Sequence, residues 1–189
     1  MSEYFTDKEF KNKDYTKNSL IKGEYDSCTF INCNFTGSDL SICTFLECEF
    51  QDCNLSLAKL NGVSLNEVQF VNCKLLGLIF SNCTTFLFAA NFDNCQLNLA
   101  SFHNLKLQKK SFKDCSLQEV DFTQTDLTQT LFDNCDLSRA VFEQSNLEKT
   151  DFRTSFNFSI DPEHNKMTKA KFSKENLEGL LGKYGLDVK

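Results

Sequence analysis

Large apolar residues recur at every fifth position over most of the chain. Twelve such positions run from Tyr25 to Phe80, and after a shift of two residues fourteen more run from Leu87 to Phe152. Each of them is Phe, Leu or Tyr. An α-helix has 3.6 residues per turn and a strand has a period of two, so neither produces this spacing. The pattern therefore indicates an internal repeat of five residues.

Small or apolar residues form a second class, two positions before each large residue. Cysteines dominate this class in the first half of the chain, as at Cys33 and Cys53, and Ala, Val and Thr join them further on. Because two positions in five point inward, the chain must turn at every repeat, as in a coil with pentapeptide sides. An Asn or Asp before Cys recurs every 20 residues, as at 32–33 and 52–53, so the coil has four sides. Successive coils are expected to stack as parallel strands about 4.8 Å apart.

The pattern divides the chain into three segments. Residues 25–158 are predicted to form an all-β structure, a quadrilateral parallel β-helix. Residues 1–24 keep large residues at period five, but Lys8 and Lys13 take inward positions, which predicts a lead-in that caps the first coil. An open solenoid end needs such a cover, because bare β edges promote aggregation. Residues 159–189 are predicted to form a tail with a short C-terminal α-helix.

The tail carries the spacing of an amphipathic helix. Four apolar residues at i, i+3, i+4 and i+7 share one helical face. These residues are Leu177, Leu180, Leu181 and Tyr184. Ser173 suits the N-cap and Gly185 suits the residue after the helix. The apolar face must be buried, either on the last coil or on a second copy of the chain. We favour the second copy, which makes this helix the interface of a homodimer.

One interruption breaks the repeat in its middle. Seven residues separate Phe80 from Leu87 where five belong, so two extra residues must bulge from a corner. One interpretation is a tolerated bulge with Phe86 buried. The other is a projecting contact loop formed by Thr84, Thr85 and Phe86, because breaks in a repeat usually lie in loops on one face.

The composition fits one domain with a large core. The chain has 189 residues, 41% of them apolar, with 20 Phe. Its formal charge is −6, which argues against direct binding to nucleic acid or to an anionic membrane surface. No run of 18 apolar residues predicts a membrane span, and the first residues lack the pattern of a secretory signal. We therefore expect a cytoplasmic protein.

The ten cysteines are best explained by packing. Nine lie two positions before a regular large residue, and Cys83 keeps the same spacing into the shifted segment. Their five-residue spacing is not a zinc-binding pattern, which needs further ligands gathered at one place. We expect reduced, buried thiols that act as small hydrophobic side chains, with no metal and no cofactor.

Acidic residues concentrate in residues 114–151. This segment holds nine acids against Arg139 and Lys149 alone. The acids are Asp114, Glu119, Asp121, Asp126, Asp133, Asp136, Glu143, Glu148 and Asp151. They fall on all four predicted sides as a girdle. Two copies joined tail to tail would place about 14 negative charges within roughly 20 Å, a density comparable to that of duplex DNA.

The repeat resembles that of the pentapeptide-repeat family. Cys-Asp-Leu-Ser-Arg-Ala-Val-Phe at 135–142 and Ser-Asn-Leu-Glu-Lys-Thr-Asp-Phe at 145–152 are similar to the family theme A-(D/N)-L-x-x. The resemblance covers roughly residues 25–152 and implies a right-handed quadrilateral β-helix. The fold alone is a weak indicator of function.

Within that family, the chain is most similar to the Qnr-type and MfpA-type branch. Leu180-Leu181 followed by Gly185-Leu186 resembles the Leu-Leu…Gly-Ile ending of Qnr proteins. This resemblance implies a rod-shaped dimer joined through its C-terminal ends, which mimics DNA toward DNA gyrase and topoisomerase IV and gives quinolone resistance. Qnr proteins carry long projecting loops that protection is thought to require, whereas this chain has only the two-residue insertion in 81–87.

Two other classes of function compete with this interpretation. A protein-interaction scaffold or toxin-immunity factor with an unknown partner remains the alternative. An enzyme is the weakest candidate, because neither His103 nor His164 lies near a nucleophile in the sequence. The chain also lacks a phosphate-binding loop or a metal motif, so no catalytic residue is predicted.

Overall fold

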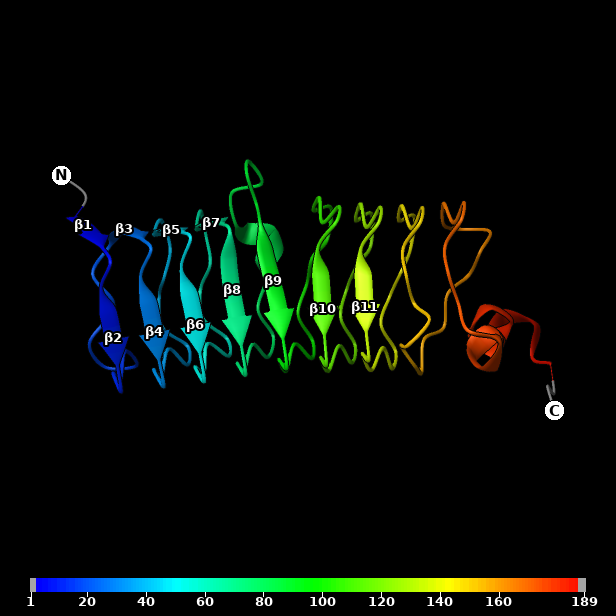
Figure 1. The fold of residues 1–189 in the computed structure, drawn as a ribbon, viewed down its shortest axis with the longest axis horizontal. Helices are drawn as coiled ribbons and strands as arrows, with labels where there is room; N and C mark the ends of the chain where they lie inside the picture. The colour runs from blue at the N-terminus through cyan, green and yellow to red at the C-terminus, as the bar shows by residue number, and fades with distance from the viewer. Residues whose placement is uncertain (1–2, 187–189) are drawn as a thin grey trace.

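The computed structural model describes residues 3–186, which form a rod of stacked four-sided coils (Figure 1). The first and last described residues lie at opposite ends of the rod. Each side of the coil is one five-residue segment, and the stacked sides form four walls. The structure is thus the predicted parallel β-solenoid.

Two walls contain the regular strands of the solenoid. Wall 1 is a four-stranded sheet, and wall 2 is a seven-stranded sheet. The strands of wall 1 are β1 (Glu3–Thr6), β3 (Gly23–Asp26), β5 (Thr44–Leu46) and β7 (Ser64–Asn66). The strands of wall 2 are β2 (Glu9–Lys11), β4 (Thr29–Ile31), β6 (Glu49–Gln51), β8 (Val68–Val71), β9 (Ala90–Asp93), β10 (Ser111–Lys113) and β11 (Leu131–Asp133). All neighbouring strands pair in parallel.

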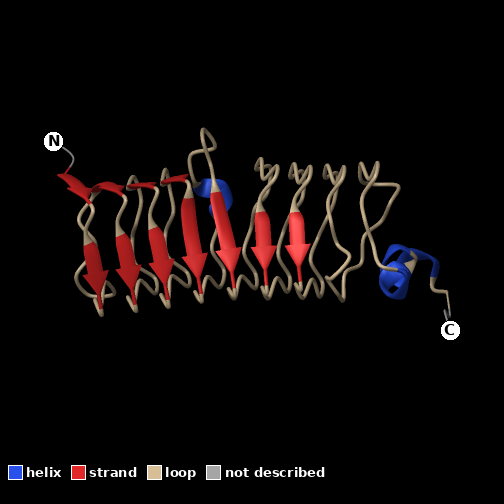
Figure 2. Cartoon of the chain, in the orientation of Figure 1, coloured by secondary structure: helices blue, strands red, loops and turns tan. Residues whose placement is uncertain are grey.

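Isolated bridges hold the remaining walls. Wall 3 contains the pair Gln96 and Ser116, and wall 4 contains the pair Ser101 and Asp121. Wall 1 continues beyond β7 through similar bridges, which is why many coils appear as loops in Figure 2. Partners lie 20 residues apart, except across the insertion, where Phe70 pairs with Phe92. The register therefore confirms the period inferred from the sequence.

The large residue of each repeat fills the interior. In wall 2, Phe30 stacks on Phe50 with centroids 4.7 Å apart and planes at 8°, and Phe112 stacks on Phe132 at 5.0 Å and 6°. All four rings are almost fully buried. Stacked rings offset along the rod axis bury large apolar areas in a favourable geometry. Identical side chains thus stack in a ladder along the rod axis.

Left-handed residues make the corners. The residue two positions after most of the large residues has positive φ, as at Asn32 (φ 49) and Leu57 (φ 59). Asn and Asp tolerate this conformation well. Where they follow one another along the corner after wall 2, their side chains also bond between coils, as from Asn94 Nδ2 to Asn72 Oδ1 at 2.9 Å. These bonds reinforce the stacking of the coils.

The inward small residues donate hydrogen bonds as well as filling space. The Cys48 thiol donates to the carbonyl oxygen of Tyr25 at 3.2 Å, and the Thr125 hydroxyl donates to that of Phe102 at 2.9 Å. All ten cysteines are buried and free, as predicted. Burial raises the pKa of the Cys48 and Cys83 thiols to about 12, which keeps them protonated and unreactive.

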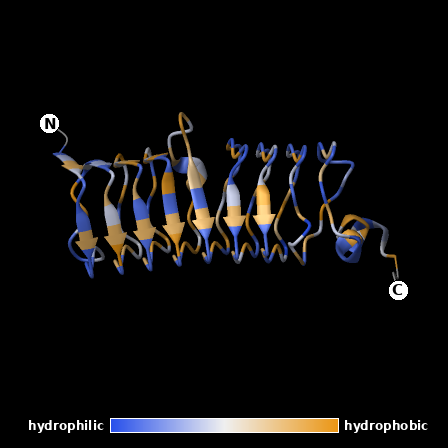
Figure 3. Cartoon of the chain, viewed as in Figure 1, coloured by the Kyte–Doolittle hydropathy of each residue, from blue (hydrophilic) through white to orange (hydrophobic). Residues whose placement is uncertain are grey.

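The insertion projects from the rod between β8 and β9 (Figure 1). Its base is the short 3-10 helix η1 (Phe80–Asn82), and its tip is apolar (Figure 3). Phe86 is 81% exposed, so the interpretation that buries it is wrong. The repeat also does not resume at Leu87, which is exposed; Phe88 is buried in its place, edge-on to Phe80. The reason is that pairing with wall 1 restarts only at Ala89, whose N–H donates to Leu65.

The N-terminal lead-in is a coil in its own right. Strand β1 pairs with β3 and β2 pairs with β4. Phe5 stacks on Tyr25 with centroids 4.8 Å apart. Lys8 and Lys13, which take the inward positions in this coil, are exposed. Because β1 and β2 are the terminal strands of their sheets, these lysines stand at the open edge.

At the other end, pairing continues past residue 158, where the sequence pattern places the end of the repeat. Asn146 bridges to Lys166 and Asp151 bridges to Lys171. Phe172 stacks on Phe152 with centroids 5.2 Å apart. The repeat spacing is lost in the sequence there, yet the backbone keeps winding for most of another coil.

Two short helices close this end. They are η2 (Lys174–Leu180) and η3 (Gly182–Tyr184), and both are 3-10 helices where the sequence predicts one α-helix. Gly179, Gly182 and Gly185 weaken the α-helical preference of this segment. Gly185 takes the predicted left-handed conformation after the helix. Among residues 3–186, no helix has the length and apolar character that crossing a membrane requires.

Helix η2 folds back on the last coil. The Ile160 N–H donates to the Gly179 carbonyl at 2.9 Å, and Asn176 Nδ2 donates to the Ser155 carbonyl at 2.7 Å. A side chain at residue 179 would collide with the backbone and ring of Phe158. Of the two alternatives for the tail, these contacts fit the one in which the helix packs on the last coil of its own chain. Leu177 nevertheless remains 44% exposed.

Candidate protein-binding surface

The nine acids of residues 114–151 lie on all four walls, as the repeat predicts. Bridges place Asp126 in wall 1, Asp151 in wall 2, Asp136 in wall 3 and Asp121 in wall 4. The others follow by their positions in the repeat. Glu148 lies in wall 1, Asp133 in wall 2 and Glu143 in wall 4, while Asp114 and Glu119 occupy left-handed corners.

Four of these acids stabilise turns. In each, one carboxylate oxygen accepts a hydrogen bond from the backbone N–H two residues later, an Asx-turn. The acceptors are Asp121 (2.9 Å), Asp126 (3.0 Å), Asp136 (3.1 Å) and Asp151 (3.2 Å). Partial burial raises the pKa of Asp126, but hydrogen bonds from Thr128 and Gln108 outweigh it and hold that pKa below its ordinary value. These carboxylates therefore stay ionised and also stabilise the turns of the coil.

Several acids already have basic partners. Asp151 pairs with Arg153 at 2.8 Å and with Lys171 at 3.3 Å, and its side chain is only 13% exposed. The hydrogen bond from Arg153 is the main cause that lowers the pKa of Asp151. Glu119 pairs with Arg139 at 2.8 Å. The acids consequently differ in how much free charge they present.

Walls 1 and 2 carry most of the bases between residues 106 and 171. They hold nine bases against four acids, Asp126, Asp133, Glu148 and Asp151. The bases are Lys106, Lys109, Lys110, Lys113, Lys149, Arg153, Lys166, Lys169 and Lys171. We call these two walls and the corner between them the basic side. The acids of the predicted girdle on this side are therefore outnumbered.

The opposite side is acidic. Walls 3 and 4, with the corner that leads into wall 3, hold seven acids and one base, Arg139, over the same residues. The acids are Asp114, Glu119, Asp121, Asp136, Glu143, Asp161 and Glu163. We call this the acidic side. Lys183 of η3 reaches its last two acids, at 2.9 and 2.7 Å. The girdle is thus uneven, and two of its acids lie outside the segment selected from the sequence.

Exposed apolar side chains border wall 4 in the middle of the rod. Ile42, Leu57 and Leu99 are each more than 60% exposed. At the edge of the same wall, the loop residues Thr84, Thr85 and Phe86 are all exposed, as a contact loop requires. Leu57 and Leu99 stand at the corner before wall 4 and the loop lies at the corner after it, so these are separate exposed apolar sites on two edges of the wall.

The predicted dimer residues do not share one exposed face. Leu177 and Tyr184 are 44% and 56% exposed, whereas Leu180 packs against the core and Leu181 is half-buried. Because η2 is a 3-10 helix, the α-helical spacing that grouped the four does not apply. The exposed members still lie at the C-terminal end of the rod.

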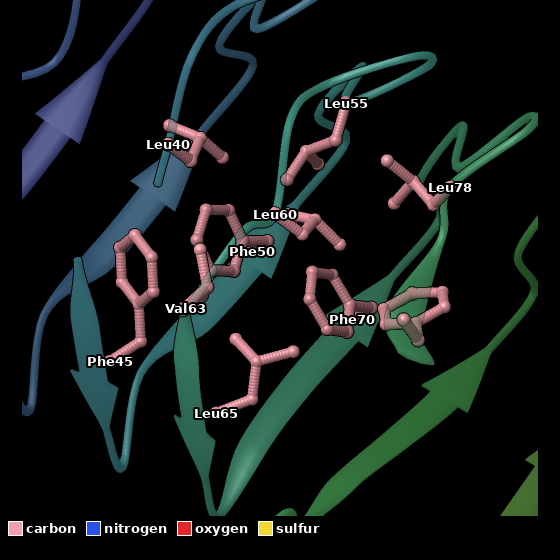
Figure 4. A pocket seen from close by; sticks show the side chains of 10 residues that line it. Leu40, Phe45, Phe50, Leu55, Leu60, Val63, Leu65, Phe70 and Leu78 are labelled. Carbon is pink, nitrogen blue, oxygen red and sulfur yellow. The ribbon is translucent and has the colours of Figure 1, made fainter. Parts of the chain in front are cut away.

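A gap in the apolar interior is too small for a ligand. Figure 4 shows this gap, which is lined by apolar side chains including Phe50, Leu60 and Phe70. Its volume is about 10 Å³, close to the minimum for a single water molecule. Within residues 3–186, no cluster of three or more His, Cys, Asp or Glu side chains is placed to hold a metal ion.

Five-residue sides, a stacked aromatic core and four parallel walls define a class of repeat protein. Residues 24–87 and 79–152 match the family model described as the pentapeptide repeat region. These matches together span well over half of the chain, so the protein belongs to the pentapeptide-repeat family.

Two solved structures of QnrB1, a plasmid-mediated fluoroquinolone resistance protein, are similar to this chain. Both are trypsin-treated variants. One is 18% identical with a TM-score of 0.62 and covers 100% of each chain. The other is 21% identical with a TM-score of 0.50 and covers 99% of this chain and 100% of its own. At 18% and 21% identity, the similarity shows a shared fold and nothing further. No curated protein matches the sequence.

Proposed function

We propose that this protein binds a type II topoisomerase, DNA gyrase or topoisomerase IV, as a mimic of DNA, and so modulates the enzyme or protects it from quinolones. The observation that carries the proposal is the acidic side of a straight, rod-shaped solenoid. Membership of the pentapeptide-repeat family and the fold shared with QnrB1, a fluoroquinolone resistance protein, support it.

The charge density of the acidic side supports the mimicry. Its seven carboxylates run from Asp114 to Glu163, about two and a half coils or roughly 12 Å of rod. That is one negative charge per about 1.7 Å, the value for duplex DNA along its axis. Arg139 and Lys183 neutralise part of it, and a second copy would double its length.

The proposed active form is a homodimer joined at the C-terminal end. Leu177 and Tyr184 supply exposed apolar surface there. The acidic side lies in the C-terminal half of the rod, so pairing at this end brings two acidic sides together. We place this complex in the cytoplasm, where a bacterial topoisomerase acts on DNA.

Supercoiling and cleavage assays with purified gyrase, with and without a quinolone, test this function. We expect micromolar protein to change supercoiling or to reduce drug-stabilised cleavage. Replacing the acidic-side residues Asp121, Asp136 and Asp161 by Asn is expected to abolish the effect. Asn still accepts the Asx-turn hydrogen bond, so circular dichroism is expected to be unchanged. No change in gyrase activity with the wild-type protein would remove the proposal.

A protein-interaction scaffold with another partner is the second candidate. The projecting loop favours it, because its tip is apolar and Phe86 is 81% exposed, and an exposed apolar surface is typical of protein contacts. A pull-down from the native host separates the two functions. Enrichment of gyrase or topoisomerase IV subunits supports the first, and their absence alongside a different protein that is lost with Phe86→Ser supports the second.

A further inference from the structure

The corner between walls 1 and 2 carries a column of lysines. Lys109, Gln129, Lys149 and Lys169 occupy the same left-handed position in four successive coils, with φ between 58° and 61°. Backbone hydrogen bonds confirm the register. The Lys109 N–H donates to the carbonyl oxygen of Thr128, next to Gln129, and the Lys149 N–H donates to that of Thr168, next to Lys169. The three lysines are exposed and stand in a straight line, at multiples of about 4.8 Å.

These lysines are free to bind an anion. Within residues 3–186, none of Lys109, Lys149 and Lys169 forms an ion pair. A shallow groove beside the column is lined by Lys149, Lys169 and Lys171, together with Gln129. Its one acid, Asp151, is already paired with Lys171 and Arg153.

The surroundings of the column point to phosphate groups. Gln129 belongs to the column, and Thr128 and Thr168 precede two of its members. Lys, Thr and Gln are typical contacts of nucleic-acid phosphates. Regular spacing along a straight edge fits a polymer whose own charges are regularly spaced, which an acidic protein segment is not. The column therefore fits a sugar-phosphate backbone.

The column also distinguishes duplex from single strand. Proteins that bind single strands stack the bases on exposed aromatic rings. On the described part of walls 1 and 2 beyond residue 106, the only large apolar side chain that is well exposed is Leu131, and no ring is. A duplex keeps its bases inside and needs only phosphate contacts. Between Lys109 and Lys169 the edge spans about 14 Å, or roughly four phosphates of one strand.

We propose that this lysine edge binds the phosphate backbone of duplex DNA, independently of base sequence. The inference departs from the expectation that an acidic chain makes no direct contact with nucleic acid. The acids that dominate the net charge lie on the opposite side of the rod, and screening at 0.1 M salt acts over about 10 Å. The proposal does not rest on topoisomerase binding, although an enzyme held by the acidic side would leave this edge free for DNA.

Fluorescence anisotropy of a labelled duplex, titrated with the full chain at several salt concentrations, tests the edge. The variant combines Lys109→Gln, Lys149→Gln and Lys169→Gln. The matched control combines Lys17→Gln, Lys59→Gln and Lys74→Gln, three exposed lysines away from this corner with the same change in net charge. Circular dichroism checks that both variants fold.

Wild type and control are expected to bind with an affinity that falls with salt. In the edge variant, the slope of log K against log salt is expected to be smaller by about 2.7, for three lost phosphate contacts. Equal slopes in the edge variant and control would overturn the proposal, as would no binding of the duplex at 50 mM salt. Tighter binding of a single strand, or equal competition by polyglutamate, would also overturn it.

Discussion

At the scale of single residues, the corner conformation determines which substitutions the solenoid tolerates. Within residues 3–186, twenty-five residues other than Gly have positive φ, and they include Ile42 at φ 62. A β-branched side chain is strained in this region of backbone space. Ile42 is also 71% exposed, so little burial compensates for the strain. The corner before β5 is therefore a weak point of the structure.

We expect Ile42→Gly to stabilise the protein by about 1 kcal/mol, because Gly adopts positive φ without strain and this exceeds its entropic cost. The denaturant midpoint measures the change. Ile21→Gly is the matched control, since Ile21 is 51% exposed and lacks positive φ. The control is expected to be destabilised, and an equal effect of the two changes would contradict the argument.

The sequence predicts the interior residues well and the corner residues poorly. Large residues and cysteines are recognisable because burial restricts their type. The corners accept Asn, Gln, Lys, Leu and Arg, so composition does not reveal their conformation. At the insertion, Leu87 and Phe88 are adjacent and both apolar, and only the restart of pairing at Ala89 decides between them.

At the scale of elements, the coil is the unit of stability and its ends need protection. Each internal coil pairs on both sides, whereas β1 and β2 pair on one side only. Lys8 and Lys13 occupy the positions that Cys28 and Cys33 fill in the next coil. Inward-pointing charges at an edge strand oppose pairing with another chain. These two lysines therefore keep the N-terminal end of the rod from extending.

The double variant Lys8→Val and Lys13→Val is expected to associate through this end, because it removes the charges and completes an apolar edge. Light scattering is expected to show a mass that rises with protein concentration. The control Lys11→Val and Lys17→Val changes exposed outward lysines and is expected to keep the wild-type mass. A double variant that behaves like the control would show that the lysines do not protect the edge.

The tail shows where periodicity misleads. Its apolar spacing is that of an α-helix, yet η2 and η3 are 3-10 helices. The spacing shows only which residues are apolar. The position of the segment on the last coil is set instead by the close contact of Gly179 with Phe158. That contact joins residues far apart in the chain, so local pattern does not contain it.

At the scale of the whole molecule, the charge is two-sided. Counting acids along residues 114–151 misses this, because it ignores the bases that the coil brings beside them from residues 106–113 and 166–171. The 20-residue period alone assigns those bases to walls 1 and 2. The two-sided charge distribution can therefore be predicted from the sequence, once each charged residue is assigned to a wall by its position in the repeat.

The proposed dimer is tested by Leu177→Asp combined with Leu181→Asp. Charged side chains at the C-terminal end are expected to prevent association, so light scattering is expected to report half the wild-type mass. Phe86→Asp with Leu87→Asp is the control, since it places the same charges on another exposed apolar site. A wild-type mass for the tail variant would show that the rods do not join there.

The fixed length of each coil has a consequence for how this family of rods can diverge. A duplication or deletion of 20 codons in frame slides the projecting loop toward or away from the acidic side by about 4.8 Å and leaves their relative orientation unchanged. A change of five codons instead turns everything downstream by a quarter of a revolution. Distance and angle between two contact sites can therefore be adjusted separately, each by its own class of genetic event.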